Sequence, residues 1–385
     1  MKVALEKVER ELAQMWEEEA KATSGSRVEL LTIAALVSEP ELMERAKAVL
    51  AYVATAHPCR TIAASWDSGT KPSIDCDVSL HRNTARANEA CGDAIVLEAH
   101  GEARAWLPEN LDRLALPDVP YCLWWVGDLP DNDTLFDEAV QHVDVVLVNS
   151  AEMDLRDLEK LSHIARGSKG KYALLDLTWI RLRGLQDLVA RFFDDPSARA
   201  YLDGLSRIEI AYSPREHEQD AASTRVGLLI GWLAARLGLD EEGARWERDA
   251  HGGEITIPRR AVSSGKRPNA GPVTVRVNQE PREGVHPGSI TRIKLTCDGP
   301  AGSGEGNFEI VRAADPHVVT WSIDAPGVAL PAHTLLIGSH EESRLLASQL
   351  ERPSRDPLFE ASVYAAYRIV RPVAPRLSVP PPRMS

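Results

Sequence analysis

Small polar residues follow three segments that the sequence predicts as buried strands. These residues are Asp67-Ser68-Gly69, Gly127-Asp128 and Asn149-Ser150. Open α/β sheets bind their ligands at the carboxyl ends of parallel strands, so these positions are candidates for binding. Glycine allows a ligand to approach the backbone closely, and aspartate accepts hydrogen bonds from a hydroxyl group or an arginine. Asp128 alone does not make an acid–base catalyst, because no second carboxylate is tied to it by spacing.

Two adjacent tryptophans, Trp124 and Trp125, precede Gly127. Neighbouring residues of a strand point to opposite faces of the sheet, so both rings are covered only where helices lie on both sides. Packing is the favoured interpretation of the pair. The alternative places the following Gly127-Asp128 at the rim of a binding crevice.

A third polar segment begins at Asp176. Asp176 or Thr178 could cap a helix that is anchored by Trp179. Arg181 and Arg183 on this helix could bind a phosphate or an acidic partner, but ordinary capping and a solvated basic face are the favoured interpretation.

Tyr212 ends a predicted strand, and Ser213-Pro214 after it favours a turn over a ligand contact. The sequence predicts no catalytic residue, no metal ligand and no cofactor. The residues that remain as candidates for binding a ligand or a partner are Trp124, Trp125, Gly127, Asp128, Asn149, Ser150, Trp179, Arg181 and Tyr212.

Sequence motifs of several enzyme classes are missing. No G-x-G-x-x-G follows a predicted strand, and neither H-E-x-x-H nor G-x-S-x-G occurs. The segment Ser264-Gly265-Lys266-Arg267 resembles half of a phosphate loop, but Arg267 replaces the hydroxyl residue that would hold magnesium. These comparisons argue against a nucleoside triphosphatase and leave a metal site without support.

The charge balance excludes two classes of partner. The chain of 385 residues has 44 basic and 57 acidic side chains, a net charge of −13, which disfavours nucleic acid and anionic membranes.

The longest apolar run, residues 226–235, is shorter than the roughly 20 residues that span a bilayer. The first residues mix charges where a secretory signal would be apolar, so we expect a cytoplasmic protein. The absence of C-x-x-C predicts reduced thiols at Cys59, Cys76, Cys91, Cys122 and Cys297.

The elements that would position the candidate residues alternate between strand and helix in the first half. The apolar run 27–37 is typical of a parallel strand covered on both faces, and the alternating segment 74–80 predicts a strand at a sheet edge. Further strands are expected at 60–66, 94–99, 120–126 and 143–148, and helices at 105–116, 135–142 and 155–165. This order predicts a doubly wound, mostly parallel sheet.

Two helices of this half have recognisable ends. Ser38 and Glu41 form a capping box for a helix that runs to about Ala56 and stops at His57-Pro58. Apolar residues recur every three or four positions over 3–19, which predicts an amphipathic helix. That helix either docks on its own chain or is offered to another subunit.

The second half reads as an α+β domain with an antiparallel sheet. Helices are expected at 178–193, 221–237, 341–350 and 358–367, and strands at 207–212, 254–257, 273–278, 290–297, 307–312 and 317–323. The glycine-flanked segment 167–170 is the best boundary. The predicted organisation is an N-terminal helix at 1–22, an α/β domain at 23–166, an α+β domain at 171–370 and a disordered proline-rich tail at 371–385.

Six short motifs in a fixed order resemble a known family, the glucose-6-phosphate dehydrogenase assembly proteins, OpcA. The resemblance covers about residues 5–240 and continues more weakly to about 340. The sequence departs from the family pattern at Cys59 and at Gly184-Leu185-Gln186. The motifs are Glu9-Arg10-Glu11-Leu12 with Trp16, His57-Pro58-Cys59-Arg60, Leu123–Asp128, Val148–Ala151, Asp176–Leu182 and Tyr212-Ser213-Pro214.

The resemblance implies a non-catalytic bacterial protein that binds glucose-6-phosphate dehydrogenase. Such a protein would promote the active oligomer of that enzyme and act as an allosteric activator in the NADP-dependent oxidative pentose phosphate pathway. Self-association of the chain stays open. The alternative from the residues is an α/β enzyme or sensor that binds a sugar phosphate or nucleotide near Gly127 and Asp128, with Arg60, Arg181 and Arg183 as phosphate contacts.

Overall fold

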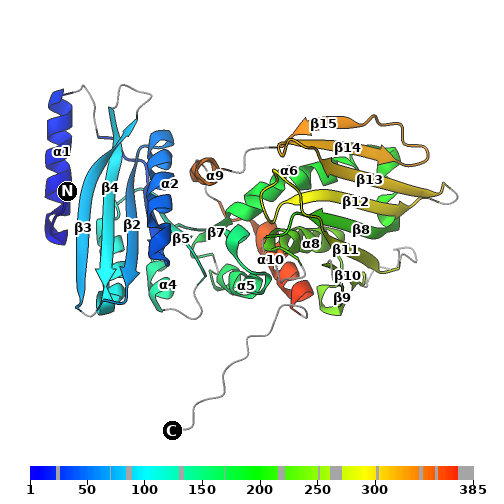
Figure 1. Ribbon diagram of the computed structural model, residues 1–385, viewed down its shortest axis with the longest axis horizontal. Helices are drawn as coiled ribbons and strands as arrows, with labels where there is room; N and C mark the ends of the chain where they lie inside the picture. The colour runs from blue at the N-terminus through cyan, green and yellow to red at the C-terminus, as the bar shows by residue number, and fades with distance from the viewer. Residues whose placement is uncertain are drawn as a thin grey trace, which may run out of the picture. The chain divides into compact units, whose positions relative to one another are not determined.

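The chain forms two compact units, each built on one sheet (Figure 1). The first unit comprises Met1–Glu152, Ile164–Arg181 and Ser339–Asp356, and the second comprises Met153–His163, Leu182–Gly338 and Pro357–Ser385. The computed structural model describes residues 1–22, 27–69, 71–83, 89–129, 134–168, 170–215, 222–249, 252–260, 271–300, 303–337, 341–351 and 354–371. The expected disordered tail lies outside these residues, apart from its first residue.

The first sheet has seven strands in the order β3-β4-β2-β1-β5-β6-β7. All its neighbouring strands are parallel except the edge strand β3, which is antiparallel to β4. The mostly parallel sheet and the edge position of the alternating segment are therefore confirmed, and the antiparallel direction of this edge strand is a new finding. The strands are β1 (Thr32–Val37), β2 (Cys59–Asp67), β3 (Ser73–Asn83), β4 (Glu89–His100), β5 (Tyr121–Val126), β6 (Val145–Val148) and β7 (Ala173–Asp176).

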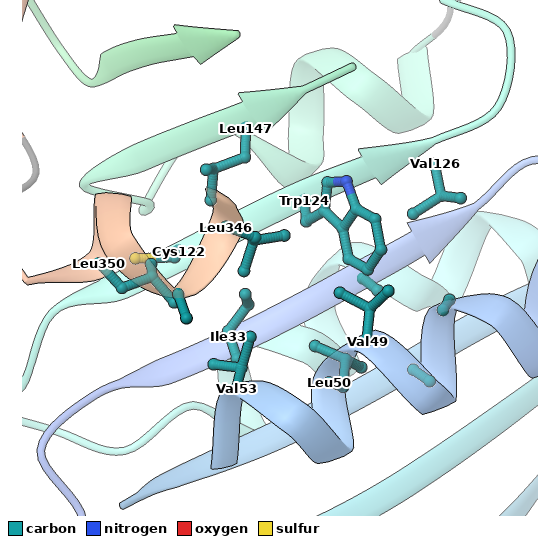
Figure 2. Packing of buried hydrophobic residues seen from close by; sticks show 14 of the residues in the cluster. Ile33, Val49, Leu50, Val53, Cys122, Trp124, Val126, Leu147, Leu346 and Leu350 are labelled. Atoms are coloured by element: carbon teal, nitrogen blue, oxygen red, sulfur yellow. The ribbon is translucent and has the colours of Figure 1, made fainter. Parts of the chain in front are cut away.

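Helices cover the first sheet on both faces. One core lies between β1, β5 and the helices α2 and α9, where Val53, Trp124 and Leu346 come together (Figure 2). The amphipathic helix α1 buries Val8, Leu12 and Trp16 beside β3, so it docks on its own chain. The helices of the first unit are α1 (Val8–Ala22), α2 (Met43–Ala56), α3 (Leu107–Leu114), α4 (Thr134–Ala139) and α9 (Glu342–Leu350), with short 3₁₀ turns at η1 (Leu5–Lys7), η2 (Pro40–Leu42), η3 (Gly101–Trp106) and η4 (Ser150–Glu152). The turn η5 (Leu155–Asp157) belongs to the second unit, and the chain returns to the first unit within α5 (Leu158–Gly167).

The capping box expected at Ser38 is wrong. The parallel pairing of β1 with β5 places Ser38 beside Val126, and the Ser38 hydroxyl donates to the Val126 carbonyl oxygen over 3.1 Å. The hydroxyl is therefore engaged by the sheet, and the chain enters α2 through the 3₁₀ turn at Pro40–Leu42, whose N-cap has no side-chain hydrogen bond. The predicted stop at His57-Pro58 is confirmed.

The second sheet has eight strands in the order β15-β14-β13-β12-β8-β11-β10-β9. Its neighbours are antiparallel except for the pair β8 and β11. The α+β architecture with a mostly antiparallel sheet is confirmed. The strands are β8 (Leu205–Tyr212), β9 (Arg245–Asp249), β10 (Gly252–Ile257), β11 (Val273–Gln279), β12 (Ile290–Asp298), β13 (Glu305–Arg312), β14 (Val318–Asp324) and β15 (His333–Leu336).

Helices pack on one face of the second sheet. Phe192, near the end of α6, stacks on Trp321 of β14 with ring centroids 4.9 Å apart, and the Trp321 indole donates to the Leu188 carbonyl oxygen over 3.0 Å. Gly238 adopts a left-handed φ of 63° and ends α8 as predicted. The helices are α6 (Leu177–Arg191), α7 (Pro196–Arg199), α8 (Thr224–Leu237) and α10 (Pro357–Val370), with 3₁₀ turns at η6 (Leu202–Gly204) and η7 (Glu241–Gly243).

Three short strands, β7, β9 and β15, were not predicted. β7 has four residues and pairs with β6, so the first sheet continues beyond the segment 167–170. Whether the parts at 1–22, 23–166 and 171–370 fold independently stays a prediction. Among the described residues, no helix is both long and apolar enough to cross a membrane.

Candidate binding site at the carboxyl ends of the parallel strands

The first sheet brings several candidate residues to one edge. β5, β6 and β7 are parallel neighbours, and their carboxyl ends lead to Gly127-Asp128, to Asn149-Ser150 and to Asp176-Thr178. The pairing of Val148 with Asp176 places the ends of β6 and β7 side by side. The edge predicted from the sequence therefore exists.

Asp176, the last residue of β7, is the centre of a buried hydrogen-bond group. Its carboxylate accepts from the Ser150 amide over 2.9 Å, the Ser150 hydroxyl over 2.6 Å and the Thr178 amide over 3.1 Å. Burial raises the pKa of Asp176, and the hydrogen bonds from Ser150 and Thr178 oppose that rise. The carboxylate ties the end of β6 to the first turn of α6. Sequence reasoning gave Asp176 a capping role and did not place it beside Ser150.

Asn149 joins side chains from three other segments of the first unit. Its amide nitrogen donates to Glu342 Oε1 over 2.8 Å, and its amide oxygen accepts from Arg181 Nη1 over 2.8 Å. Glu342 also forms an ion pair with Arg45 at 2.7 Å. Glu342 lies 193 residues beyond Asn149, so no spacing in the sequence could have found this contact.

The two tryptophans lie on opposite faces of β5, and both are buried. Trp124 packs in the core between α2 and α9 (Figure 2). Within the described part of the chain, its indole nitrogen has no hydrogen-bond partner. Trp125 donates through its indole nitrogen to the Asp128 carbonyl oxygen over 2.8 Å and meets the ring of Phe136 edge-on at 5.3 Å. Packing accounts for both rings.

The backbone conformation at position 127 and the neighbouring Ser38 both require a glycine there. Its φ of 100° lies in the left-handed region, and a Cβ atom there would collide with the Ser38 hydroxyl. Asp128 is exposed. The close approach at this glycine is therefore made by Ser38, and the Asp128 side chain remains accessible for a ligand or a partner.

The last two candidates make contacts elsewhere. The Trp179 indole donates to Asp356 Oδ2 over 2.9 Å. Tyr212 belongs to the second unit, is fully buried, and accepts a hydrogen bond from the Gln279 amide over 3.0 Å. A binding role for the nine candidates stays a prediction.

Arg60 does not lie at this edge, which corrects its suggested role as a phosphate contact beside Gly127. β1 pairs through Thr32 with Arg60 at the amino end of β2, and through Val37 with Val126 at the carboxyl end of β5. Those two positions are five residues apart along β1, or about 17 Å. Arg60 instead binds Asp93 through Nε at 3.0 Å and Nη2 at 2.8 Å.

Arg60 and Asp93 form the centre of a buried ionic cluster that holds α1. Trp16 donates to Asp93 Oδ1 over 2.7 Å, and Arg60 Nη2 donates to Glu9 Oε2 over 3.0 Å. Arg27 reaches Asp93 Oδ2 at 2.6 Å. Burial would raise the pKa of Asp93, but hydrogen bonds from neighbouring side chains and the two arginines lower it.

Neither a metal centre nor a reactive thiol is visible in the described part of the chain. It contains no cluster of three or more histidine, cysteine, aspartate or glutamate side chains that could hold a metal ion. Burial raises the pKa of the thiols of Cys59, Cys76, Cys91, Cys122 and Cys297, to about 11 for Cys76 and about 12 for Cys122 and Cys297. A thiol that stays protonated at neutral pH is a weak nucleophile.

Both halves of the chain match domains of a glucose-6-phosphate dehydrogenase subunit. Residues 51–166 match the subunit's N-terminal domain and residues 172–363 its C-terminal domain. The chain belongs to the OpcA family of glucose-6-phosphate dehydrogenase subunits.

Curated relatives carry the same family name. An OxPP cycle protein OpcA from Synechocystis is 28% identical over 197 residues, which is 48% of this chain and 38% of the relative. Its counterpart in Synechococcus elongatus is 25% identical over 318 residues, or 81% of this chain and 67% of the relative. The alignments therefore span about two-fifths to two-thirds of the relatives' lengths.

Solved structures show a weaker likeness. An NAD binding oxidoreductase from Klebsiella pneumoniae has a TM-score of 0.46 at 11% identity over 88% of this chain and 94% of that one. A biliverdin reductase from Synechocystis has a TM-score of 0.42 at 10% identity over 87% of this chain and 96% of that one. At this level of similarity, the chemistry of those enzymes says nothing about this chain.

Proposed function

We propose that the chain is a non-catalytic, cytoplasmic subunit that binds glucose-6-phosphate dehydrogenase and promotes its active oligomer. One observation carries the proposal: both halves match domains of a glucose-6-phosphate dehydrogenase subunit. Relatives named for the oxidative pentose phosphate cycle support the same pathway.

The hydrogen bonds at the sheet edge support a holding role. The Asp176 carboxylate is bound by Ser150 and Thr178, and the Asn149 amide by Arg181 and Glu342. These contacts fix the loops after β6 and β7 instead of presenting polar groups to a reacting molecule. A rigid edge of this kind is suited to displaying a surface of constant shape, on which the exposed Asp128 is one candidate contact.

The mechanism we propose is a population shift. A subunit that binds the active assembly of the dehydrogenase more tightly than the inactive one moves the equilibrium towards the active form. The usual range of allosteric coupling, about 1–3 kcal/mol, would change the apparent affinity for glucose 6-phosphate by roughly five- to 150-fold.

Mixing the purified chain with its cognate dehydrogenase tests this function. We expect light scattering to show a heavier complex and kinetics to show a lower half-saturating concentration of glucose 6-phosphate. Asp128→Asn should weaken both effects, whereas Asp187→Asn, at an exposed position of α6, serves as the matched control. If the wild-type chain changes neither the mass nor the substrate dependence of the dehydrogenase, the proposal is wrong.

The sugar-phosphate or nucleotide alternative makes a different prediction. In that alternative Arg60 was a phosphate contact, but Arg60 binds Asp93 and Glu9 at the opposite end of the sheet. Calorimetry of the chain alone should therefore give no heat of binding with glucose 6-phosphate or NADP. Saturable heat with either ligand would favour the alternative.

A further inference from the structure

The second sheet has two unlike faces. Ile208, Ile210 and Phe308 alternate along the strands on the buried face, where α6 and α8 lie (Figure 1). The residues between them, such as Glu209 and Glu309, belong to the other face and are half-buried. This other face is called the outer face below.

Charged residues form one row across the outer face, at right angles to the strands. Cross-strand pairing joins each member of the row to the next. The charges alternate in sign from the second member to the last. In order from β9 to β13, the row consists of Glu247, Glu254, Arg276, Glu209, Lys294 and Glu309.

The row is complementary to a copy of itself. Consider two outer faces packed together by a two-fold axis that runs along the strands between β8 and β11. This operation lays β8 over β11 of the second copy, and β12 over β10. Arg276 then faces Glu209 of the second copy, and Lys294 faces Glu254 of the second copy. Because the axis generates every pair twice, four opposite-charge contacts form at the centre.

The neighbouring rows do not oppose this arrangement. The same axis sets Arg207 against Thr274 and Arg292 against Gly252, so no like charges meet there. Among the described residues of these rows, like charges meet where Glu247 faces Glu309, at the rim. Twisted sheets packed face to face diverge towards their edges, which separates this last pair.

We propose that the outer face of the second sheet is an interface with a second copy of this chain. Stacked sheets lie about 10 Å apart, a gap that arginine, lysine and glutamate side chains from both copies can bridge. Six strands overlap under this axis, since β14 and β15 lie beyond β9 of the second copy. At about 4.8 Å between strands and about six residues each, the overlap is roughly 24 by 20 Å. This area is smaller than the about 800 Å² that each partner buries in a stable complex, so we expect a weak dimer that depends on the charge pairs.

Alternation of charge also stabilises a single sheet, since opposite charges on adjacent strands attract each other. The distinction between the two roles lies in Glu254 and Lys294. Within one chain these residues are separated by β11 and β8 and are not neighbours, whereas across the two-fold axis they face each other. A charge exchange between them therefore reports on the contact between copies.

The test uses two single reversals of the full chain, Lys294→Glu and Glu254→Lys, with sedimentation velocity as the readout. The wild-type chain should be a dimer that dissociates as salt is raised. Each reversal alone sets like charges against each other twice and should weaken the dimer about tenfold or more. An equimolar mixture of the two variants should form dimers again, because the glutamate introduced in one variant then faces the lysine introduced in the other.

The mixture separates the interface from a folding defect, since a misfolded variant would not recover its partner. Thr320→Glu, at an exposed position of β14 far from the axis, is the control and should leave the dimer intact. A monomeric wild-type chain would overturn the proposal, as would reversals without effect or a mixture that stays monomeric. If the wild-type chain is a monomer and Lys294→Glu abolishes binding of the dehydrogenase, the outer face belongs to that enzyme instead. This outcome would leave the proposed function standing.

Discussion

The two ends of the first sheet both bury polar side chains, but they satisfy them differently. At the amino end, Arg60 and Asp93 neutralise each other inside a cluster of charges. At the carboxyl end, the Asp176 carboxylate is held mainly by neutral donors from Ser150 and Thr178. Removing a partner at the amino end therefore leaves a buried charge without its counter-charge, whereas removing a partner at the carboxyl end removes one hydrogen bond.

The largest effect is expected at Asp93. Asp93→Asn keeps the shape of the side chain but leaves Arg60 and Arg27 with less compensation in a buried cluster. Breaking a buried ion pair in this way costs about 3–5 kcal/mol. Urea unfolding should show that loss, and α1 should become more accessible to proteases. A cost below about 1 kcal/mol would contradict a structural role for the cluster.

The matched change at the other end should cost less. Asp176→Asn leaves the amide oxygen to accept from the backbone, and the Ser150 hydroxyl can turn to accept from the new amide group. The burial that raises the pKa of Asp176 also means that removing its charge relieves a desolvation cost. We expect a loss of about 1–2 kcal/mol in urea unfolding, with Ser150→Ala similar. If Asp176→Asn costs as much as Asp93→Asn, the contrast between the two ends is wrong.

The carboxyl end was predictable because its signal is local. Each strand ended at a small polar residue, and parallel strands place such ends together. Trp124 and Trp125 gave a second local signal, because two adjacent buried rings require helices on both faces of the sheet. Ser38 shows the limit of local patterns: its capping box is plausible in sequence, but the neighbouring strand engages its hydroxyl.

The amino end was not predictable, because its members come from four distant segments. Trp16 and Asp93 are 77 residues apart, and Arg60 lies between them on another strand. The pattern of α1 indicated an apolar stripe, and the sequence left open what that stripe covers. β7 was missed for a related reason, since four residues are too few to show a period.

Glu29, whose pKa is affected by Asp93 at the amino end of the sheet, should make the stability of the protein depend on pH. Burial and the neighbouring Asp93 raise the pKa of Glu29 to about 7, from 4.5 in the unfolded chain. The folded state therefore holds the proton that the unfolded state releases, so stability falls as pH rises from about 4.5 to about 7, by at most about 1.4 kcal/mol per pH unit. Glu29→Gln should remove this slope. His81, whose pKa burial lowers to about 4, adds an opposite slope in both chains that cancels in the difference. A difference in unfolding free energy that stays constant with pH would contradict the assignment.

The smallest expected effect separates the two tryptophans. Trp124→Phe and Trp125→Phe remove the same volume from buried positions on opposite faces of β5. Trp125→Phe also removes the hydrogen bond to the Asp128 carbonyl oxygen, whereas Trp124→Phe removes an indole nitrogen that has no partner among the described residues. Trp125→Phe should therefore cost about 1 kcal/mol more in urea unfolding. Equal costs would mean that the rings act through volume alone. The loop at Gly127 and Asp128 would then be held by the contact with Ser38 and not by the indole.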